Sequence, residues 1–289
     1  MLQVARLAPT LLGESADLVT AFLRRSALPD GSFGDRGGGS DLYYTVFGLE
    51  GLLAFGEPPP QNTRGYLTGF GDGAGLDFVH LTCLARAWAS TDPNGPPPEL
   101  RAGIAGRIET FRSADGGYAA TTGADRGSAY ACFLALGALE DLHAPVERPE
   151  AIIDCVRASR AADGGYANQP GMAEGMTPPT AAAVTVLRHL DAAVERDIAS
   201  WLLARAHPEG GFLASRRAPM PDLLSTATAL HALTALHADL APLREPCLDF
   251  VDSLWTNAGG FHGHWADDAL DCEYTYYGLL ALGHLSLLR

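Results

Sequence analysis

Several segments of the chain carry small and apolar residues on nearly every face of a potential helix. They begin at Asp41, Asp77, Ser128, Thr180, Thr226 and Thr275. A helix without a polar face is covered on every side, so each segment predicts a buried inner helix. More amphipathic segments, such as 98–113 and 195–207, carry their charges on one face and predict outer helices. The pattern therefore predicts an all-α protein in which outer and inner helices alternate.

A Gly-Gly-aromatic turn precedes four of the inner segments. It occurs at 116–118, 164–166, 210–212 and 259–261, with spacings of 48, 46 and 49 residues, and a weaker copy stands at 30–33. Paired glycines reach backbone angles that are closed to other residues, so they suit a tight stop after a helix. We expect the aromatic side chain that follows to pack between neighbouring helices.

A repeat of this length predicts a closed or open array of helix pairs. The closed form is an (α/α)6 toroid of about six helix pairs, which would span residues 1–289 as a single domain around a central cavity. An open solenoid is the alternative. Its terminal repeats carry polar caps, whereas the final repeat, 257–285, is as apolar as the middle ones. We therefore expect the ring to close.

Composition narrows the class of partner. A formal net charge of −14 argues against a nucleic-acid or anionic-membrane surface, since both need clustered basic residues. The five cysteines are dispersed without a CxxC motif, which is typical of reduced thiols in a cytosolic protein. No apolar run is long enough to predict a membrane span, and the N-terminus lacks the pattern of a signal peptide. We expect a soluble, cytoplasmic protein.

The turn, polar loop and inner helix together resemble the prenyltransferase and squalene-oxidase repeat. Protein prenyltransferase β subunits and class II terpene cyclases share this repeat, and the resemblance covers essentially the whole chain. It implies a toroid that holds an apolar isoprenoid and, for the prenyltransferases, a partner subunit. The segment 125–130 resembles an Asp-x-Arg-Ser-Ala-Tyr motif whose arginine faces the substrates. The resemblance thereby implies a substrate contact for Arg126.

The residues that carry the known reactions of these relatives are largely replaced. Asp222 corresponds to a zinc-ligand aspartate, but Leu224 and Tyr274 stand where the cysteine and histidine ligands are expected. Leucine cannot ligate and tyrosine rarely does, so a family-type zinc site is not supported. In the cyclase motif Asp-x-Asp-Asp-Thr-Ala, which corresponds to 222–227, the proton donor is also replaced by Leu224.

Acidic residues near the start of the last inner helix are the candidate proton donors. A carboxyl group that is crowded by like charges beside an apolar cavity has a raised pKa and can act as a general acid. Asp271, Glu273 and Asp222 are the catalytic candidates on this argument. The alternative for the aspartates that begin inner helices is capping, because a carboxylate there accepts backbone N–H bonds and favours the helix dipole.

Metal binding is a further possibility in the same loop. Asp267 and Asp268 could hold Mg²⁺ that neutralises a diphosphate, since hard cations prefer carboxylate oxygens. His262 and His264 could bind a transition metal. The sequence leaves the cofactor open.

Aromatic and basic side chains are the candidates for substrate binding. Aromatic faces stabilise developing carbocations, although ordinary core packing is the alternative. Arginines could meet an anionic head group, and Arg36, beside three glycines, ranks lower because its loop could be flexible. The substrate-binding candidates are Tyr44, His80, Arg126, Tyr130, Arg216, Tyr274 and Tyr277.

Three hypotheses for the function follow. The preferred one is an isoprenoid-handling enzyme that processes a polyene or prenyl diphosphate through a nonstandard general acid. The second is a zinc-independent subunit similar to a prenyltransferase β subunit, which would need a protein partner. The third is a noncatalytic toroid that binds an apolar ligand or a protein.

Overall fold

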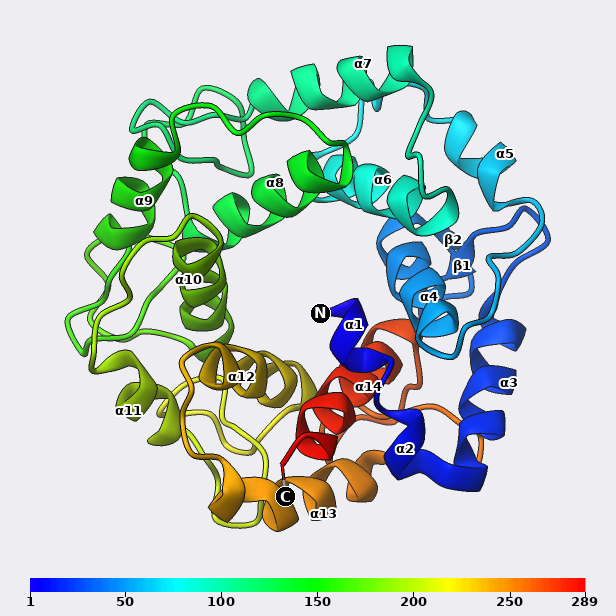
Figure 1. The fold of residues 1–289 in the computed structure, drawn as a ribbon, viewed down its shortest axis with the longest axis vertical. Coiled ribbons are helices and arrows are strands. Elements are labelled where there is room, and N and C mark those ends of the chain that lie inside the picture. The colour runs from blue at the N-terminus through cyan, green and yellow to red at the C-terminus, as the bar shows by residue number, and fades with distance from the viewer. Residues whose placement is uncertain (289) are drawn as a thin grey trace. The chain divides into compact units, whose positions relative to one another are not determined.

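The computed structural model describes residues 1–288, and helices dominate it (Figure 1). The predicted inner segments form α4 (Leu42–Ala54), α6 (Phe78–Thr91), α8 (Ala129–Asp141), α10 (Thr177–His189), α12 (Leu223–Ala235) and α14 (Cys272–Ser286). The outer helices are α3 (Ala16–Ser26), α5 (Thr63–Thr68), α7 (Pro98–Glu109), α9 (Pro149–Ala158), α11 (Ile198–Leu203) and α13 (Arg244–Leu254). The remaining elements are α1 (Leu2–Ala5), α2 (Pro9–Leu12), the 3₁₀ helices η1 (Gly13–Ser15) and η2 (Ala241–Leu243), and the antiparallel strands β1 (Phe33–Gly34) and β2 (Ser40–Asp41). The alternation of inner and outer helices is confirmed.

The chain forms two compact units, one made of 1–62 with 199–289 and the other of 63–198. In the second unit, α6, α8 and α10 pack side by side, and α5, α7 and α9 pack against them. In the first unit, α4, α14 and α12 pack side by side, while α3 packs against α4 and α13 against α14. The single domain over 1–289 stays a prediction.

Packing within the first unit brings the first inner helix against the last. Helix α4 and helix α14 are direct neighbours, as Figure 1 shows. An open solenoid keeps its terminal repeats apart, because each repeat contacts only the next along the chain. The open alternative is therefore contradicted at this junction, and residues more than 200 positions apart in the sequence can share a site.

Each Gly-Gly-aromatic turn is fixed to the inner helix that follows it. The first glycine has a φ of 88° to 95° in the four strong copies, a conformation that disfavours any side chain. The aromatic side chain is buried. The backbone N–H of the same residue donates to a side chain of the inner helix. The acceptors are Thr45 for Phe33, Cys132 for Tyr118, Thr180 for Tyr166, Thr226 for Phe212 and Thr275 for Phe261. The expected packing of these aromatics is confirmed.

Capping aspartates start four of the inner helices. The carboxylates of Asp41, Asp77, Asp222 and Asp271 each accept a backbone N–H from three residues further on. Helix α10 lacks such a cap and begins earlier than predicted, at Thr177, because the two prolines that follow suit a first helical turn. No helix among residues 1–288 is both long and apolar enough to cross a membrane.

Candidate active site

The acidic loop between α13 and α14 meets the amino ends of α12 and α14 in the first unit. The amide of Leu223 donates to the carbonyl oxygen of Gly263 (2.8 Å), which ties the start of α12 to this loop. The ring of Tyr274 packs on the α-carbon of Gly263, where an added Cβ would come within 2.6 Å of the ring. These contacts hold Tyr274 between the two helix ends.

Arg36, on the β1–β2 hairpin, binds two carboxylates of the loop and α14. Its Nε donates to Asp271 (2.7 Å), and its two terminal nitrogens donate to both oxygens of Asp267 (3.2 and 2.9 Å). The guanidinium carbon lies 5.4 Å from the centre of the Tyr274 ring. The hydrogen bonds to Asp267 raise the pKa of Arg36 further, so it stays charged. Arg36, which ranked low beside its glycines, is therefore a central residue of this site.

The carboxylates of Asp267 and Asp271 are both engaged in hydrogen bonds to Arg36. Burial favours the neutral form of Asp267, but Arg36 and two backbone amides outweigh it and lower the pKa. The Asp271 side chain is only 2% exposed, and it accepts from both Arg36 and the amide of Tyr274 (2.8 Å). Both carboxylate oxygens of Asp271 are thus engaged, one by the Arg36 guanidinium and the other by the helix amide. This geometry argues against Asp271 as a proton donor.

Asp222 is also engaged in capping. Its two oxygens accept from the amide and the hydroxyl of Ser225, both at 2.7 Å. Burial nevertheless raises the pKa of Asp222, since these bonds offset only part of the desolvation cost.

Glu273 differs from both aspartates because it does not cap its helix. Its carboxylate accepts a hydrogen bond from the Tyr43 hydroxyl (2.6 Å) on the neighbouring helix α4. Burial raises the pKa of Glu273, the charge of Asp271 adds to this effect, and Tyr43 and Arg36 oppose it. Of the three candidate acids, Glu273 is thus the one that has a raised pKa and does not cap a helix.

A cluster of aromatic side chains on helices α4 and α14 includes Tyr43, the hydrogen-bond partner of Glu273. Phe47 is at the centre, 4.9 Å from the Tyr43 ring and 5.4 Å from the Tyr277 ring. Tyr44 lies 5.7 Å from Tyr43, and Tyr274 lies 6.4 Å from Tyr277. All five side chains are half-buried, so they present faces beyond their own packing. Burial raises the pKa of Tyr274 to about 12 and also raises that of Tyr44, so both hydroxyls stay neutral.

The candidate metal ligands do not come together. The Nδ1 atom of His262 is bonded to the Ala269 carbonyl (3.0 Å), and Nδ1 of His264 accepts from the Ala266 amide (3.2 Å). Asp268 is exposed. Among residues 1–288, no group of three or more His, Cys, Asp or Glu side chains is arranged to hold a metal ion. The zinc site of the prenyltransferases does not fit these residues, and no step below passes through a metal.

The remaining substrate candidates belong to segments of the chain other than those that form this cluster. His80 is in the second unit, where its Nδ1 is hydrogen-bonded to the capping Asp77 (2.9 Å). Arg126 and Tyr130 are exposed at the start of α8 in the same unit. Arg216 belongs to the first unit and is exposed in the loop before α12. Their roles stay predictions.

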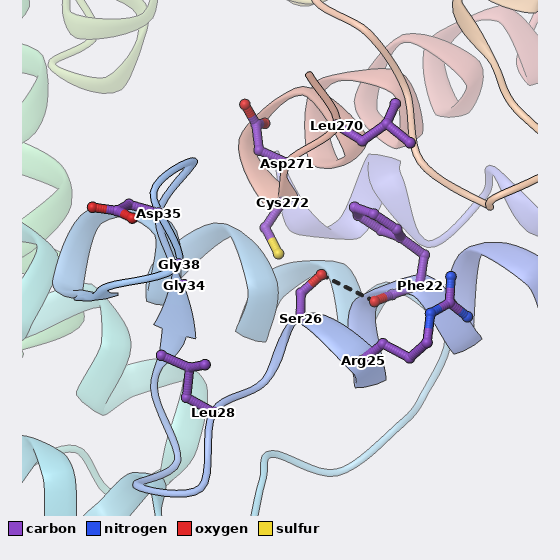
Figure 2. A pocket seen from close by; sticks show the side chains of 10 residues that line it. All are labelled: Phe22, Arg25, Ser26, Leu28, Gly34, Asp35, Gly38, Leu270, Asp271 and Cys272. Atoms are coloured by element: carbon purple, nitrogen blue, oxygen red, sulfur yellow. Dashed lines mark hydrogen bonds between the residues drawn. The ribbon is translucent and has the colours of Figure 1, made fainter. Parts of the chain in front are cut away.

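A pocket of about 220 Å³ lies next to the start of α14, between α3 and the β1–β2 hairpin (Figure 2). The Cys272 sulfur points into it toward Ser26, whereas the Asp271 carboxylate points the other way. Burial raises the pKa of Cys272 to about 12, so its thiol is not a nucleophile at neutral pH. The pocket therefore adds no reactive group to the site.

Solved proteins with a similar fold have different activities. A type II terpene cyclase from Scytonema, MstE, solved with geranylgeranyl dihydroxybenzoate, is 13% identical with a TM-score of 0.64, and the match covers 97% of each chain. Protein geranylgeranyltransferase-I from Candida albicans is 15% identical with a TM-score of 0.65, covering 94% of this chain and 90% of that one. A polysaccharide lyase is 14% identical with a TM-score of 0.58, covering 95% and 97%. At these identities the likeness concerns the fold.

No curated protein matches the sequence. The family model of the prenyltransferase alpha-alpha toroid domain matches residues 108–196 and again 180–288, which is more than half of the chain. This agrees with the repeat and with the closed junction between α4 and α14. The chain therefore belongs to the prenyltransferase α/α toroid domain family, and its fold class is the α/α toroid.

Proposed function

We propose that this protein is an isoprenoid-handling enzyme in which Glu273 protonates an apolar polyene and so starts a cyclisation or rearrangement. The observation that carries the proposal is the setting of Glu273, a carboxyl with a raised pKa beside half-buried aromatic rings from α4 and α14. Two of the structures with a similar fold are a terpene cyclase and a geranylgeranyltransferase, which supports an isoprenoid ligand.

The proposed reaction begins with a neutral Glu273. Its carboxyl proton is transferred to one carbon of a double bond, whose electron pair forms the new C–H bond and leaves a cation on the adjacent carbon. A neighbouring double bond of the same polyene then attacks this cation and closes a ring. Loss of a proton from carbon to the Glu273 carboxylate ends the sequence and restores the acid. No redox partner is needed.

Tyr43 acts as the positioning residue for this acid. Its hydroxyl donates to one oxygen of Glu273, which leaves the other oxygen to carry and release the proton. The bond also orients the carboxyl group toward α4, the helix that supplies Tyr43, Tyr44 and Phe47. A general acid needs this combination of orientation and a pKa near the working pH.

The aromatic cluster supplies the stabilisation that a carbocation requires. The ring faces of Phe47, Tyr43 and Tyr277 carry negative charge density that attracts a cation without reacting with it as a carboxylate would. The phenolic groups with raised pKa values stay neutral, so they do not quench the cation as phenolates. An apolar polyene also gains from contact with these rings.

The experiment is a product assay with a panel of neutral polyenes and prenyl diphosphates, read by mass spectrometry. We expect cyclised product from the unmodified protein and a loss of roughly 100-fold or more in Glu273→Gln, since proton transfer by a positioned acid contributes about that much. Glu245→Gln, which alters an exposed carboxylate on α13, is the matched control and should leave turnover unchanged.

Each outcome separates the hypotheses for the function. Equal turnover by Glu273→Gln and the unmodified protein removes Glu273 as the acid. Product that appears only after a second protein is added favours a prenyltransferase-like subunit. Thermal stabilisation by a polyene without turnover of any substrate in the panel favours a noncatalytic binding protein.

A further inference from the structure

Two cysteines stand in the repeat that begins with the turn at 116–118. Other repeats carry different residue types at the same places. Cys132, in α8, accepts the N–H of Tyr118 (3.4 Å), a role that threonine hydroxyls fill in the other repeats. Cys155, in α9, packs on the second glycine of the turn, Gly117, where the corresponding glycines of the first unit meet phenylalanine rings. Both changes occur in the same repeat, so they place two thiols against one turn.

The two sulfur atoms flank a single point. An ideal Cβ built on Gly117 would lie 2.2 Å from the sulfur of Cys155 and 3.2 Å from the sulfur of Cys132. Because both distances meet at one point, the two sulfur atoms are close neighbours, and each thiol shifts the pKa of the other. Both side chains are buried, and the residues come from adjacent inner and outer helices. A disulfide requires the two sulfur atoms to approach to about 2.05 Å.

The local charges favour a thiolate on Cys132. The neighbouring Cys155 thiol lowers the pKa of Cys132 in spite of burial, and the Tyr118 amide and the nearby Arg112 guanidinium act in the same direction. The neighbouring Cys132 and burial raise the pKa of Cys155, whose thiol stays protonated. A thiolate is the form of cysteine that reacts with oxidants, and a second thiol in contact can then resolve the oxidised product.

We propose that Cys132 and Cys155 form a peroxide-sensitive thiol pair that closes to a disulfide between α8 and α9. In the first step, the Cys132 sulfur attacks one oxygen of hydrogen peroxide, giving the sulfenic acid and, after protonation of the departing hydroxide, water. In the second step, the Cys155 sulfur attacks the Cys132 sulfur and a second water leaves. The sum converts two thiols and one peroxide into a disulfide and two waters, and local opening of α9 admits the oxidant.

This pair is connected to the loop that carries the substrate-binding candidate Arg126. Gly127 lies against the Cys155 sulfur, since an added Cβ there would come within 2.7 Å of it. The Gly127 amide is held by Asp115 (3.2 Å), and Gly127 lies between Arg126 and the capping Ser128 of α8. Contraction of the sulfurs on oxidation withdraws Cys155 from Gly127. The loop 119–128 therefore loses a packing partner when the pair is oxidised.

The test treats the native protein with hydrogen peroxide, blocks remaining thiols with iodoacetamide and digests after glutamate. Because Glu140 and Glu147 lie between the two cysteines in the sequence, a disulfide joins two peptides that digestion otherwise separates. We expect linked peptides that contain Cys132 and Cys155, with a loss of two hydrogen atoms. We also expect faster amide hydrogen exchange over 119–128 in the oxidised protein.

Matched variants keep the test decisive. Cys132→Thr installs the residue that other repeats use at this place, so it should fold, form no linked peptide and show no peroxide effect on hydrogen exchange. Cys247→Ser, which removes a buried thiol from α13, should still form the link. The proposal would be overturned if Cys132 and Cys155 were alkylated to the same extent with and without peroxide. It would also be overturned if either were linked to another cysteine. This inference is independent of the proposed function.

Discussion

Glu273 and Asp271 lie two positions apart at the start of α14, yet their surroundings give them different chemistry. Asp271 accepts from a helix amide with one carboxylate oxygen and from Arg36 with the other. Glu273 is past the cap, faces α4 and is bonded to a neutral phenol. Desolvation therefore dominates at Glu273 and raises its pKa. At the scale of residues, hydrogen-bond partners decide which acid is held in a structural role.

Tyr43→Phe tests this account of Glu273. The Tyr43 hydroxyl lowers the pKa of Glu273 in part, so its removal raises that pKa further. A general acid works only when protonated, and activity falls as the pH rises through its pKa. We expect the pH at which activity is half lost to rise by about half to one unit, the equivalent of one hydrogen bond. Tyr66→Phe, on α5 in the second unit, is the control. A midpoint that stays or falls contradicts the account.

Helices in the first unit pack through glycines that admit a neighbouring backbone. Gly283 of α14 lies against the carbonyl of Val4 in α1, and an added Cβ would come within 2.0 Å of that oxygen. A backbone atom cannot rotate away as a side chain can, so the helix itself has to move. The small N-terminal helix α1 thus depends on one glycine for its contact with α14.

Gly283→Ala should therefore displace α1 and destabilise the protein. We expect a loss of roughly 1–3 kcal/mol in the free energy of unfolding, which is typical of overpacking, measured by urea denaturation. Gly106→Ala, on the exposed face of α7 with nothing near its Cβ position, should be neutral or stabilising by about 1 kcal/mol at most. Equal effects of the two substitutions would show that the contact between α1 and α14 carries no such constraint.

Arg36 joins the first and sixth repeats through a charged contact. Its removal leaves the carboxylate of Asp271, 2% exposed, without its counter-ion. We expect Arg36→Met to lower the free energy of unfolding by about 1–3 kcal/mol, because an uncompensated buried charge is costly. Arg64→Met breaks an exposed pair with Asp92 and should cost about 1 kcal/mol or less. Thermal melts of the two variants give the comparison, and an Arg36→Met protein as stable as Arg64→Met would contradict this role.

The fold could be predicted further than the site. The Gly-Gly-aromatic turns and all-round apolar segments depend on residues close in sequence, and the capping aspartates follow the same local logic. Arg36 was undervalued because its partners lie 231 and 235 positions away, and only the packing of α4 on α14 brings them together. Glu273 and Asp271 were equivalent in sequence since burial and hydrogen bonding, which separate them, are tertiary properties.

At the scale of the whole molecule, the half-buried His231 and the buried His284 link α12 and α14 at the ends away from the acidic loop. His284 is bonded to His231 (3.1 Å) and to Thr234 (3.2 Å). Burial lowers the pKa of His231 to about 4 and that of His284 to about 3, and the amino group of Met1 adds to both shifts. Between pH 6.5 and these values the unfolded chain binds more protons than the folded one, so stability falls as the pH is lowered.

Replacing both histidines by glutamine should flatten this dependence. The unmodified protein should lose roughly 2–4 kcal/mol more than the double variant between about pH 7 and pH 5, because two lowered pKa values contribute. Urea midpoints at the two pH values provide the measurement, with the exposed His189→Gln as control. Parallel losses in the double variant and the unmodified protein would show that other groups cause the acid sensitivity.

The most direct test of the central claim is turnover of a polyene in D₂O by the unmodified protein and by Glu273→Gln. If Glu273 delivers the first proton, a solvent-exchanged carboxyl places one deuterium on the carbon that is protonated at the start. The account predicts singly deuterated cyclic product from the unmodified protein and almost none from Glu273→Gln. Product without deuterium, or equal labelled product from both proteins, would contradict it.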